Sequence, residues 1–219
     1  MRFLLLLLLV LIVPAHYAAA QETSTALPGK KAPELSIDEQ LGLTKRGEGR
    51  KSTGNLKRDY ALKYYDECLK RKHAYISQAG KELLCGCTSQ RMETDLSYED
   101  VVALFNDKDK APDVHRELLQ VSYGQCIRHP VNLMVYNDCM NMDALKPLGQ
   151  KAQHVVCKCQ SDTMSRFLTI NGQDVVRLEL SRNPENVDPL GSYLASDSFR
   201  LIHDSHFKRC MDIHVYGYR

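Results

Sequence analysis

The chain has 219 residues, a formal net charge of +2, eight cysteines and no tryptophan. The nearly neutral charge argues against a dedicated nucleic-acid-binding protein, because binding to the phosphate backbone requires concentrated positive charge. Charged residues make up 26% of the chain and aromatic residues 7%, which leaves apolar material for two small cores rather than one large core.

Residues 1–20 have the features of a secretory signal peptide. Arg2 supplies positive charge, residues 3–13 form a short apolar run, and Ala18-Ala19-Ala20 offers a small-residue cleavage site. The apolar run is shorter than the ~20 residues that a membrane-spanning helix needs, and no other stretch is long and apolar enough. We therefore expect an exported protein, periplasmic or secreted, with no transmembrane segment after cleavage of the signal.

Residues 21–55 predict a flexible arm ahead of the fold. They are rich in Thr, Pro, Gly and charge and show little periodicity. The later part of this arm is basic, from Lys45-Arg46 to Arg50-Lys51. A solvated linker is the simplest interpretation, and the alternatives are contact with an acidic surface or dibasic cleavage after Arg46.

Residues 56–129 predict about four short helices. Apolar residues recur at helical spacing in the first of these helices, and Gly80 predicts the turn that follows it. Ser97-x-x-Asp100 resembles a capping box at the start of the third helix. The expected helices cover residues 56–78, the stretch around 83–92, 98–106 and 114–128.

Residues 130–219 predict the same order of helices again. Pro130 separates the halves, Asn171-Gly172 predicts a turn, and residues 182–197 predict a loop insertion. The expected helices cover residues 131–142, 150–168, a stretch beginning near 174, and 198–214. No stretch alternates with period two, so we expect no sheet.

The eight cysteines repeat one pattern in the two halves. A lone cysteine precedes a Cys-x-Cys pair, and another lone cysteine follows after a longer gap: Cys68, Cys85, Cys87 and Cys126, then Cys139, Cys157, Cys159 and Cys210. Met92 and Met164 hold matching places after their Cys-x-Cys pairs. The sequence therefore predicts an all-α protein with two tandem disulfide-stapled modules, residues 56–129 and 130–219.

Exported proteins use cysteines mainly as disulfides. Two residues apart on an α-helix means about 200° of rotation, so the two sulfurs of a Cys-x-Cys pair face different neighbours. We favour the pairs Cys68–Cys87, Cys85–Cys126, Cys139–Cys159 and Cys157–Cys210. The reason is that Cys85 shares a stripe with Met92 and Leu96, which we expect to face the later helices; the swapped pairing stays open.

A helix with one cysteine followed by a Cys-x-Cys helix, at residues 60–95 and again at 132–168, resembles small exported bacterial helical proteins. The resemblance implies no enzymatic activity, and most members of that group have no assigned function. The absence of any Asn-x-Ser/Thr acceptor agrees with a bacterial source over a eukaryotic glycoprotein.

Two constellations suggest other chemistry. His203, His206 and His214 share one helical face with Cys210 and offer a zinc or copper site. Cys210 is needed for a disulfide, however, so no metal site is favoured. Cys85-Gly86-Cys87 offers a thiol–disulfide oxidoreductase, but it lies inside a predicted helix, whereas redox thiolates sit near helix starts.

No known catalytic motif or cofactor-binding motif is present. The leading interpretation is an exported, non-enzymatic interaction or structural module, such as an accessory subunit of a cell-envelope or secreted assembly. We expect an unidentified protein partner, no cofactor and no nucleic acid.

Overall fold

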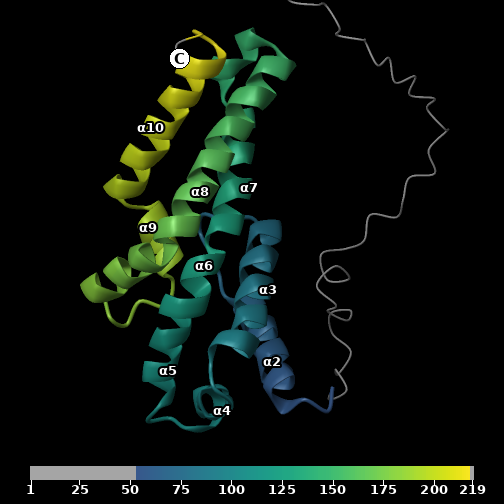
Figure 1. Ribbon diagram of the computed structural model, residues 1–219, viewed down its shortest axis with the longest axis vertical. Coiled ribbons are helices and arrows are strands. Elements are labelled where there is room, and N and C mark those ends of the chain that lie inside the picture. Colours follow the sequence, from purple (N-terminus) through teal and green to yellow (C-terminus); the bar gives the residue numbers. More distant parts are fainter. Residues whose placement is uncertain (1–52, 218–219) are drawn as a thin grey trace, which may run out of the picture. The chain divides into compact units, whose positions relative to one another are not determined.

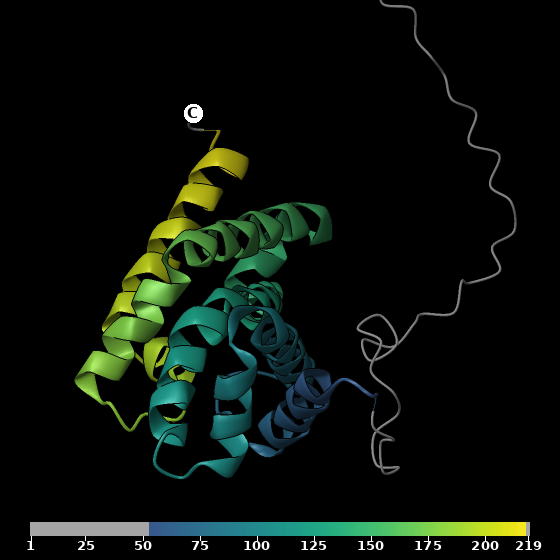
Figure 2. The same cartoon turned by 60° about the horizontal axis from the view of Figure 1, so that its bottom comes forward.

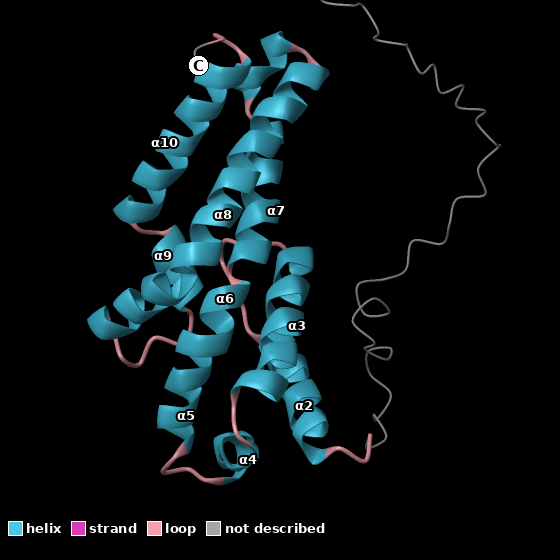
Figure 3. Cartoon of the chain, viewed as in Figure 1, coloured by secondary structure: helices cyan, strands magenta, loops and turns pink. Residues whose placement is uncertain are grey.

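The computed structural model describes residues 53–217. The expected signal peptide, and the expected arm up to residue 52, lie outside the described residues. Every regular element between residues 53 and 217 is helical and none is a strand (Figure 3). The all-α prediction is confirmed.

The first half contains short helices whose starts are fixed by side-chain caps. The side chains of Asn55, Ser77 and Ser97 accept hydrogen bonds from backbone N–H groups in the first turns of α2, α3 and α4. The elements are α2 (Leu56–Lys70), α3 (Gln78–Asp95), α4 (Tyr98–Asn106), α5 (Ala111–Leu118), a π-helix η1 (Leu119–Tyr123) and α6 (Gly124–Cys126).

The first predicted helix was too long. It ends at Lys70 because Arg71 takes an extended conformation, and a new helix begins after Ser77. Gly80 lies inside the first turn of α3, where its N–H donates to the Ser77 hydroxyl at 3.1 Å. The predicted start of α4 after Ser97 is confirmed.

The second half is organised around one long helix. Its elements are α7 (Arg128–Met140), the 3-10 helix η2 (Asp143–Leu148), α8 (Gln150–Arg182), α9 (Pro189–Leu194) and α10 (Asp197–His214). Pro130 lies in the first turn of α7, where a missing N–H costs no intrahelical hydrogen bond. The predicted boundary at residue 130 therefore falls inside a helix. Figures 1 and 2 show α10 lying along α8.

The predicted turn at Asn171-Gly172 is wrong, since α8 runs through it without a break for 33 residues. The Asn171 amide donates to the Phe167 carbonyl at 2.8 Å, within the helix. A Cβ atom at Gly172 would overlap the carbonyl oxygen of Gly124, and a Cβ at Gly124 would lie 2.9 Å from the Cα of Gln173. Glycine is needed here for the close crossing of α6 and α8.

All eight cysteines lie among the described residues and form four disulfides. The pairs are Cys68–Cys85, Cys87–Cys126, Cys139–Cys157 and Cys159–Cys210. This is the swapped pairing, so the favoured pairs Cys68–Cys87, Cys85–Cys126, Cys139–Cys159 and Cys157–Cys210 are wrong. Each bridge stays within one predicted half.

The stripe that motivated the favoured pairing exists and contacts helices on both sides of α3 in sequence. Cys85, Met92 and Leu96 share a cluster with Tyr65 and Cys68 of α2, the earlier helix, and also with residues of the later helices α4 and α5. The sequence places these side chains on one face, but the rotation of α3 about its own axis depends on the loop at residues 71–77. The spacing of the cysteines does not determine that rotation.

The largest hydrophobic cluster crosses between the predicted halves. Leu84 of α3 packs in one cluster with residues of the second half and of the segment that leads into it. These residues are Ile127, which precedes α7, Val131 of α7, and Met164 and Val176 of α8. All five side chains are fully buried. Each disulfide lies within one predicted half, whereas the core contains residues of both halves. The division into two tandem modules therefore stays a prediction.

Replacing Gly172 by alanine tests the α6–α8 crossing. Gly172→Ala should lower the free energy of unfolding by about 1–3 kcal/mol, because the methyl group must displace backbone atoms. Gly80→Ala is the matched control, since the nearest atoms to its Cβ are at 3.4 Å. The control should be neutral or stabilising by up to about 1 kcal/mol, because alanine favours helix. Denaturant unfolding without reductant measures both, and equal effects would contradict the close crossing.

Candidate functional site

A groove of about 350 Å³ lies between α5 and the loop that joins α8 to α9. Its size falls in the range of sites that take a small ligand or the side chains of a partner. Helix α5, the π-helix, the end of α8 and the loop all contribute to its wall. The lining residues are Pro112, His115, Arg116, Leu119, Leu180, Pro184, Glu185, Asn186 and Val187.

The apolar part of the groove combines buried and exposed side chains. Leu119 and Leu180 are buried and belong to the largest core cluster, so the groove opens directly onto the core. Val187 is 66% exposed at the edge of the groove. His115, Arg116, Glu185 and Asn186 also line the groove, so its exposed lining is about half polar.

His115 is the groove residue with the most altered ionisation. Burial, helped by the nearby positive charge of Arg71, lowers the pKa of His115 to about 4. Its Nε2 atom is buried and has no hydrogen-bond partner among the described residues. His115 is therefore neutral near pH 7.

Asp188 fixes the loop that forms one wall of the groove. One of its carboxylate oxygens accepts from the Gly191 N–H at 2.9 Å and from the Tyr123 hydroxyl at 3.5 Å. The other oxygen lies 3.2 Å from Nδ1 of His73, whose side chain is 6% exposed. These contacts join the loop at residues 183–188 to the loop between α2 and α3.

These contacts shift the pKa of Asp188. Burial acts to raise its pKa, but the hydrogen bonds from His73, Gly191 and Tyr123 and the charge of His73 lower the pKa by more. The pKa of Asp188 is therefore below its ordinary value. The folded structure stabilises the ionised carboxylate and with it the loop.

The π-helix brings Leu119 into the groove and Tyr123 to Asp188. The Val121 carbonyl accepts from the Gln173 amide of α8 at 3.1 Å. The Ser122 hydroxyl donates to Asp95 of α3 at 3.1 Å. Such π-helical turns recur at functional sites. The helix predicted for residues 114–128 continues through this stretch as a regular helix, so neither the π-helix nor the groove was predicted.

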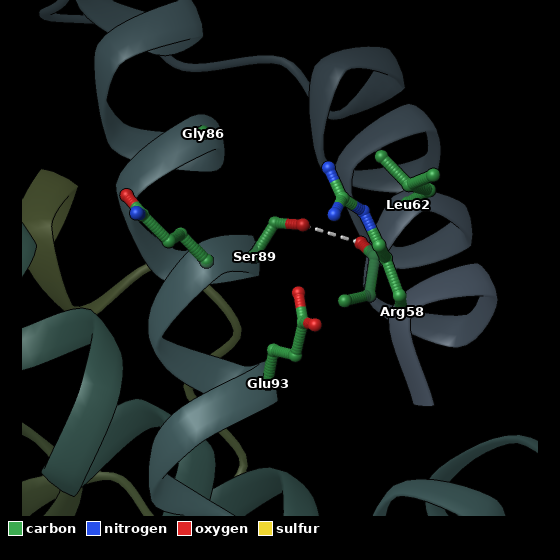
Figure 4. Close-up of a pocket in the computed structure, with 7 residues that line it drawn as sticks. Arg58, Leu62, Gly86, Ser89 and Glu93 are labelled. Carbon is green, nitrogen blue, oxygen red and sulfur yellow. Dashed lines mark hydrogen bonds between the residues drawn. The ribbon is translucent and has the colours of Figure 1, made fainter. Parts of the chain in front are cut away.

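A second pocket, of about 160 Å³, lies between α2 and α3 (Figure 4). Arg58 projects from α2 and Glu93 from α3, and the Ser89 hydroxyl donates to the Ala61 carbonyl at 2.5 Å. The pocket is smaller than the ~300 Å³ at which ligand sites begin. We assign it no function.

The histidines proposed as weak metal candidates do not converge on one point. His203 contacts the Gln160 amide at 2.8 Å, and His206 lies against the Phe167 ring. His214 is exposed at the end of α10, and Cys210 is bonded to Cys159. Between residues 53 and 217 no three side chains of the metal-ligating types His, Cys, Asp and Glu form a cluster.

The Cys-Gly-Cys and Cys-Lys-Cys pairs do not form bonds within themselves. Each sulfur bonds to a different helix, and six of the eight cysteines are buried, namely Cys68, Cys85, Cys126, Cys139, Cys157 and Cys210. No free thiol occurs in the described part of the chain. Bridges of this kind indicate folding in an oxidising compartment.

Comparison with known proteins supplies no family. No protein-family model matches the chain, and no curated protein or solved structure is significantly similar to it. The resemblance to small exported bacterial helical proteins therefore stays an expectation. Within residues 53–217, every helix is too short or too polar to cross a bilayer.

Asp188→Asn tests the anchoring of the loop. Near pH 7 the substitution should lower the free energy of unfolding by about 1–3 kcal/mol, since a partly buried charge-assisted contact is lost. The pKa of Asp188 is depressed in the folded state, so its contribution is present above the unfolded value of 3.8 and is lost as the pH falls below it. The difference between variant and wild type should therefore shrink in acid.

The matched control for this experiment is Asp174→Asn, which removes an exposed ion pair with Arg177. An exposed pair contributes little, so the control should stay within about 0.5 kcal/mol of wild type. Urea unfolding at neutral and acidic pH measures both variants. If Asp188→Asn is as stable as wild type near pH 7, the ion pair does not hold the loop.

His115→Phe tests the buried neutral imidazole. The folded pKa of about 4 lies below the ordinary value of 6.5, so the unfolded chain takes up the proton first as the pH falls. Wild type should therefore lose stability between these two pH values, and His115→Phe should lose less. The substitution His214→Asn, at an exposed position, serves as the control. Its free energy of unfolding should change with pH as that of wild type does. Free energies of unfolding at several pH values measure this effect. The same pH dependence in all three proteins would show that the His115 imidazole is not the cause.

Proposed function

We propose that the protein is an exported, non-enzymatic interaction module that contacts a protein partner through the groove between α5 and the loop at residues 183–188. The observation that carries the proposal is a groove of mixed polar and apolar lining whose loop wall is anchored by contacts within the chain. The buried contact between His73 and Asp188 holds the loop, at 3.2 Å. Fixed walls reduce the ordering cost of binding.

The disulfides support the same interpretation from the other side of the groove. Cys87–Cys126 joins α3 to α6, directly after the π-helix that contributes Leu119. The groove is thus bounded by a covalently held segment on one side and an anchored loop on the other. A rigid concave surface of this kind suits recognition of a partner's side chains.

The lining residues also favour binding over catalysis. Among the described residues that line the groove there is no Ser, Thr, Cys, Lys or Tyr, and the remaining candidate nucleophiles are His115 and Glu185. His115 is neutral near pH 7 and has no carboxylate partner of its own in the described structure. We infer a cell-envelope or secreted assembly as the setting, with this chain as an accessory subunit.

Site-specific photo-crosslinking of the protein to its partner, in an extract of the native source, tests the proposal. A photoreactive residue at Val187, 66% exposed on the groove, should give one discrete adduct. The same probe at Leu201, 70% exposed on α10, is the matched control and should give none. Excess unlabelled wild-type protein should compete away the adduct.

A competitor carrying Val187→Asp should fail to compete, because a charge on the groove opposes burial against an apolar partner. Thermal unfolding of this variant should match wild type, since the side chain is exposed. Equal adducts from both probe positions, or full competition by the Val187→Asp protein, would show that the groove is not the contact site.

A further inference from the structure

The buried side chain of Gln160 meets His203 where α8 and α10 cross. Gln160 is fully buried, and its Nε2 atom lies 2.8 Å from Nε2 of His203 and 3.4 Å from the His203 carbonyl oxygen. On the other side of the ring, Nδ1 of His203 lies 3.1 Å from the Asp204 carboxylate. The imidazole therefore has a polar partner at each nitrogen.

The Asp204 carboxylate decides where the proton of a neutral His203 sits. An ionised carboxylate only accepts hydrogen bonds, so Nδ1 must carry the hydrogen. Nε2 then has a lone pair and accepts from the Gln160 amide. In this state the Oε1 atom of Gln160 is buried and has no hydrogen-bond partner in the described structure.

We propose that Gln160 and His203 form a proton-responsive contact, in which the Gln160 amide turns over when His203 gains a second proton. A charged imidazole carries hydrogen on both nitrogens. Two N–H groups would then face each other across the 2.8 Å between the Nε2 atoms. A half-turn of the amide removes the conflict, since Oε1 then accepts a charge-assisted hydrogen bond from His203.

The two states differ in what they leave unpaired. In the neutral state Oε1 of Gln160 is unpaired, and in the charged state the amide nitrogen takes that buried position. The His203 carbonyl loses its 3.4 Å contact at the same time. The proton therefore selects between two hydrogen-bond patterns at one helix crossing.

The groups around the ring define the electrostatics of this contact. On α10, the Asp204 carboxylate lies beside Nδ1 of the ring and is 70% exposed, and His206 follows one turn later. On α8, Lys158 and Asp162 are paired with each other and are 61% and 43% exposed, about 200° round the helix from the buried Gln160. The Phe199 ring lies against the imidazole with centroids 5.6 Å apart, and Tyr193 of α9 packs behind Phe199.

The position of the contact determines its effect. Cys210 is the one residue of α10 that is fully buried, and it is bonded to Cys159. The disulfide holds the later half of α10 on α8 in both states. The proton thus changes the seating of the earlier half of the helix, around Phe199 and His203, without releasing it.

Nuclear magnetic resonance on the intact helical protein tests the proposal. The side-chain amide signals of Gln160 should move through a pH titration with the same midpoint as the His203 ring signals. Asp204→Ala removes the acceptor at Nδ1 and should shift the Gln160 signals toward their acidic positions at neutral pH. Gln160 signals that stay constant, or that follow His206 instead, would overturn the proposal.

Substitution of Gln160 separates a proton-responsive contact from simple packing. Gln160→Glu places an opposite charge beside the ring and should raise the midpoint of the His203 titration by roughly one pH unit. Gln160→Met keeps the volume, removes the amide and should reduce the pH-dependent shift of the Phe199 ring signals to the direct effect of the imidazole charge 5.6 Å away. A shift as large as that of wild type in Gln160→Met would refute the mechanism, and if this variant does not fold, the wild-type titration alone decides.

Discussion

A Cys-x-Cys pair inside an α-helix can only bond to two different neighbours, because its sulfurs point about 200° apart. This constraint makes α3 and α8 the central helices of the structure. Helix α3 is bonded to α2 through Cys85 and to α6 through Cys87. Helix α8 is bonded to α7 through Cys157 and to α10 through Cys159. In both cases the first cysteine takes the earlier helix and the second takes the later one.

The other features follow from how α6, which is bonded to α3, meets α8. Gly124 and Gly172 allow α6 to cross α8 at backbone contact, and the largest core cluster forms around that crossing. The π-helix adjusts the chain just before Gly124, so that Leu119 and Tyr123 both reach this cluster. The groove opens at its edge, where the loop held by Asp188 passes over the end of α8.

Local signals in the sequence predicted the local structure. The capping serine Ser97 placed a helix start correctly, and the cysteine pattern identified which residues are bridged and that bridges stay within each half. The rotation of α3 was not predictable, because it depends on the loop after α2 and on packing against Tyr65 rather than on spacing. Asn171-Gly172 was misassigned because a glycine required for close helix contact and a glycine required for a turn look alike in sequence. The groove gave no signal, since it is built from residues far apart in the chain, such as His115 and Val187.

The spacing of the bridged cysteines has a consequence for biogenesis. Because a chain is synthesised from its amino terminus, Cys68 can pair with either Cys85 or Cys87 before Cys126 is available. The two choices close loops of nearly equal length. The paired cysteines are 17 residues apart in the native bridge and 19 residues apart in the alternative, Cys68–Cys87. The entropy of loop closure therefore does not distinguish them. The second half faces the same choice at Cys157 and Cys159, and the native partner of Cys159 lies 51 residues further on. Correct pairing is therefore selected by how the helices pack, and a mispaired bridge can be corrected by thiol–disulfide exchange once the later cysteine is available.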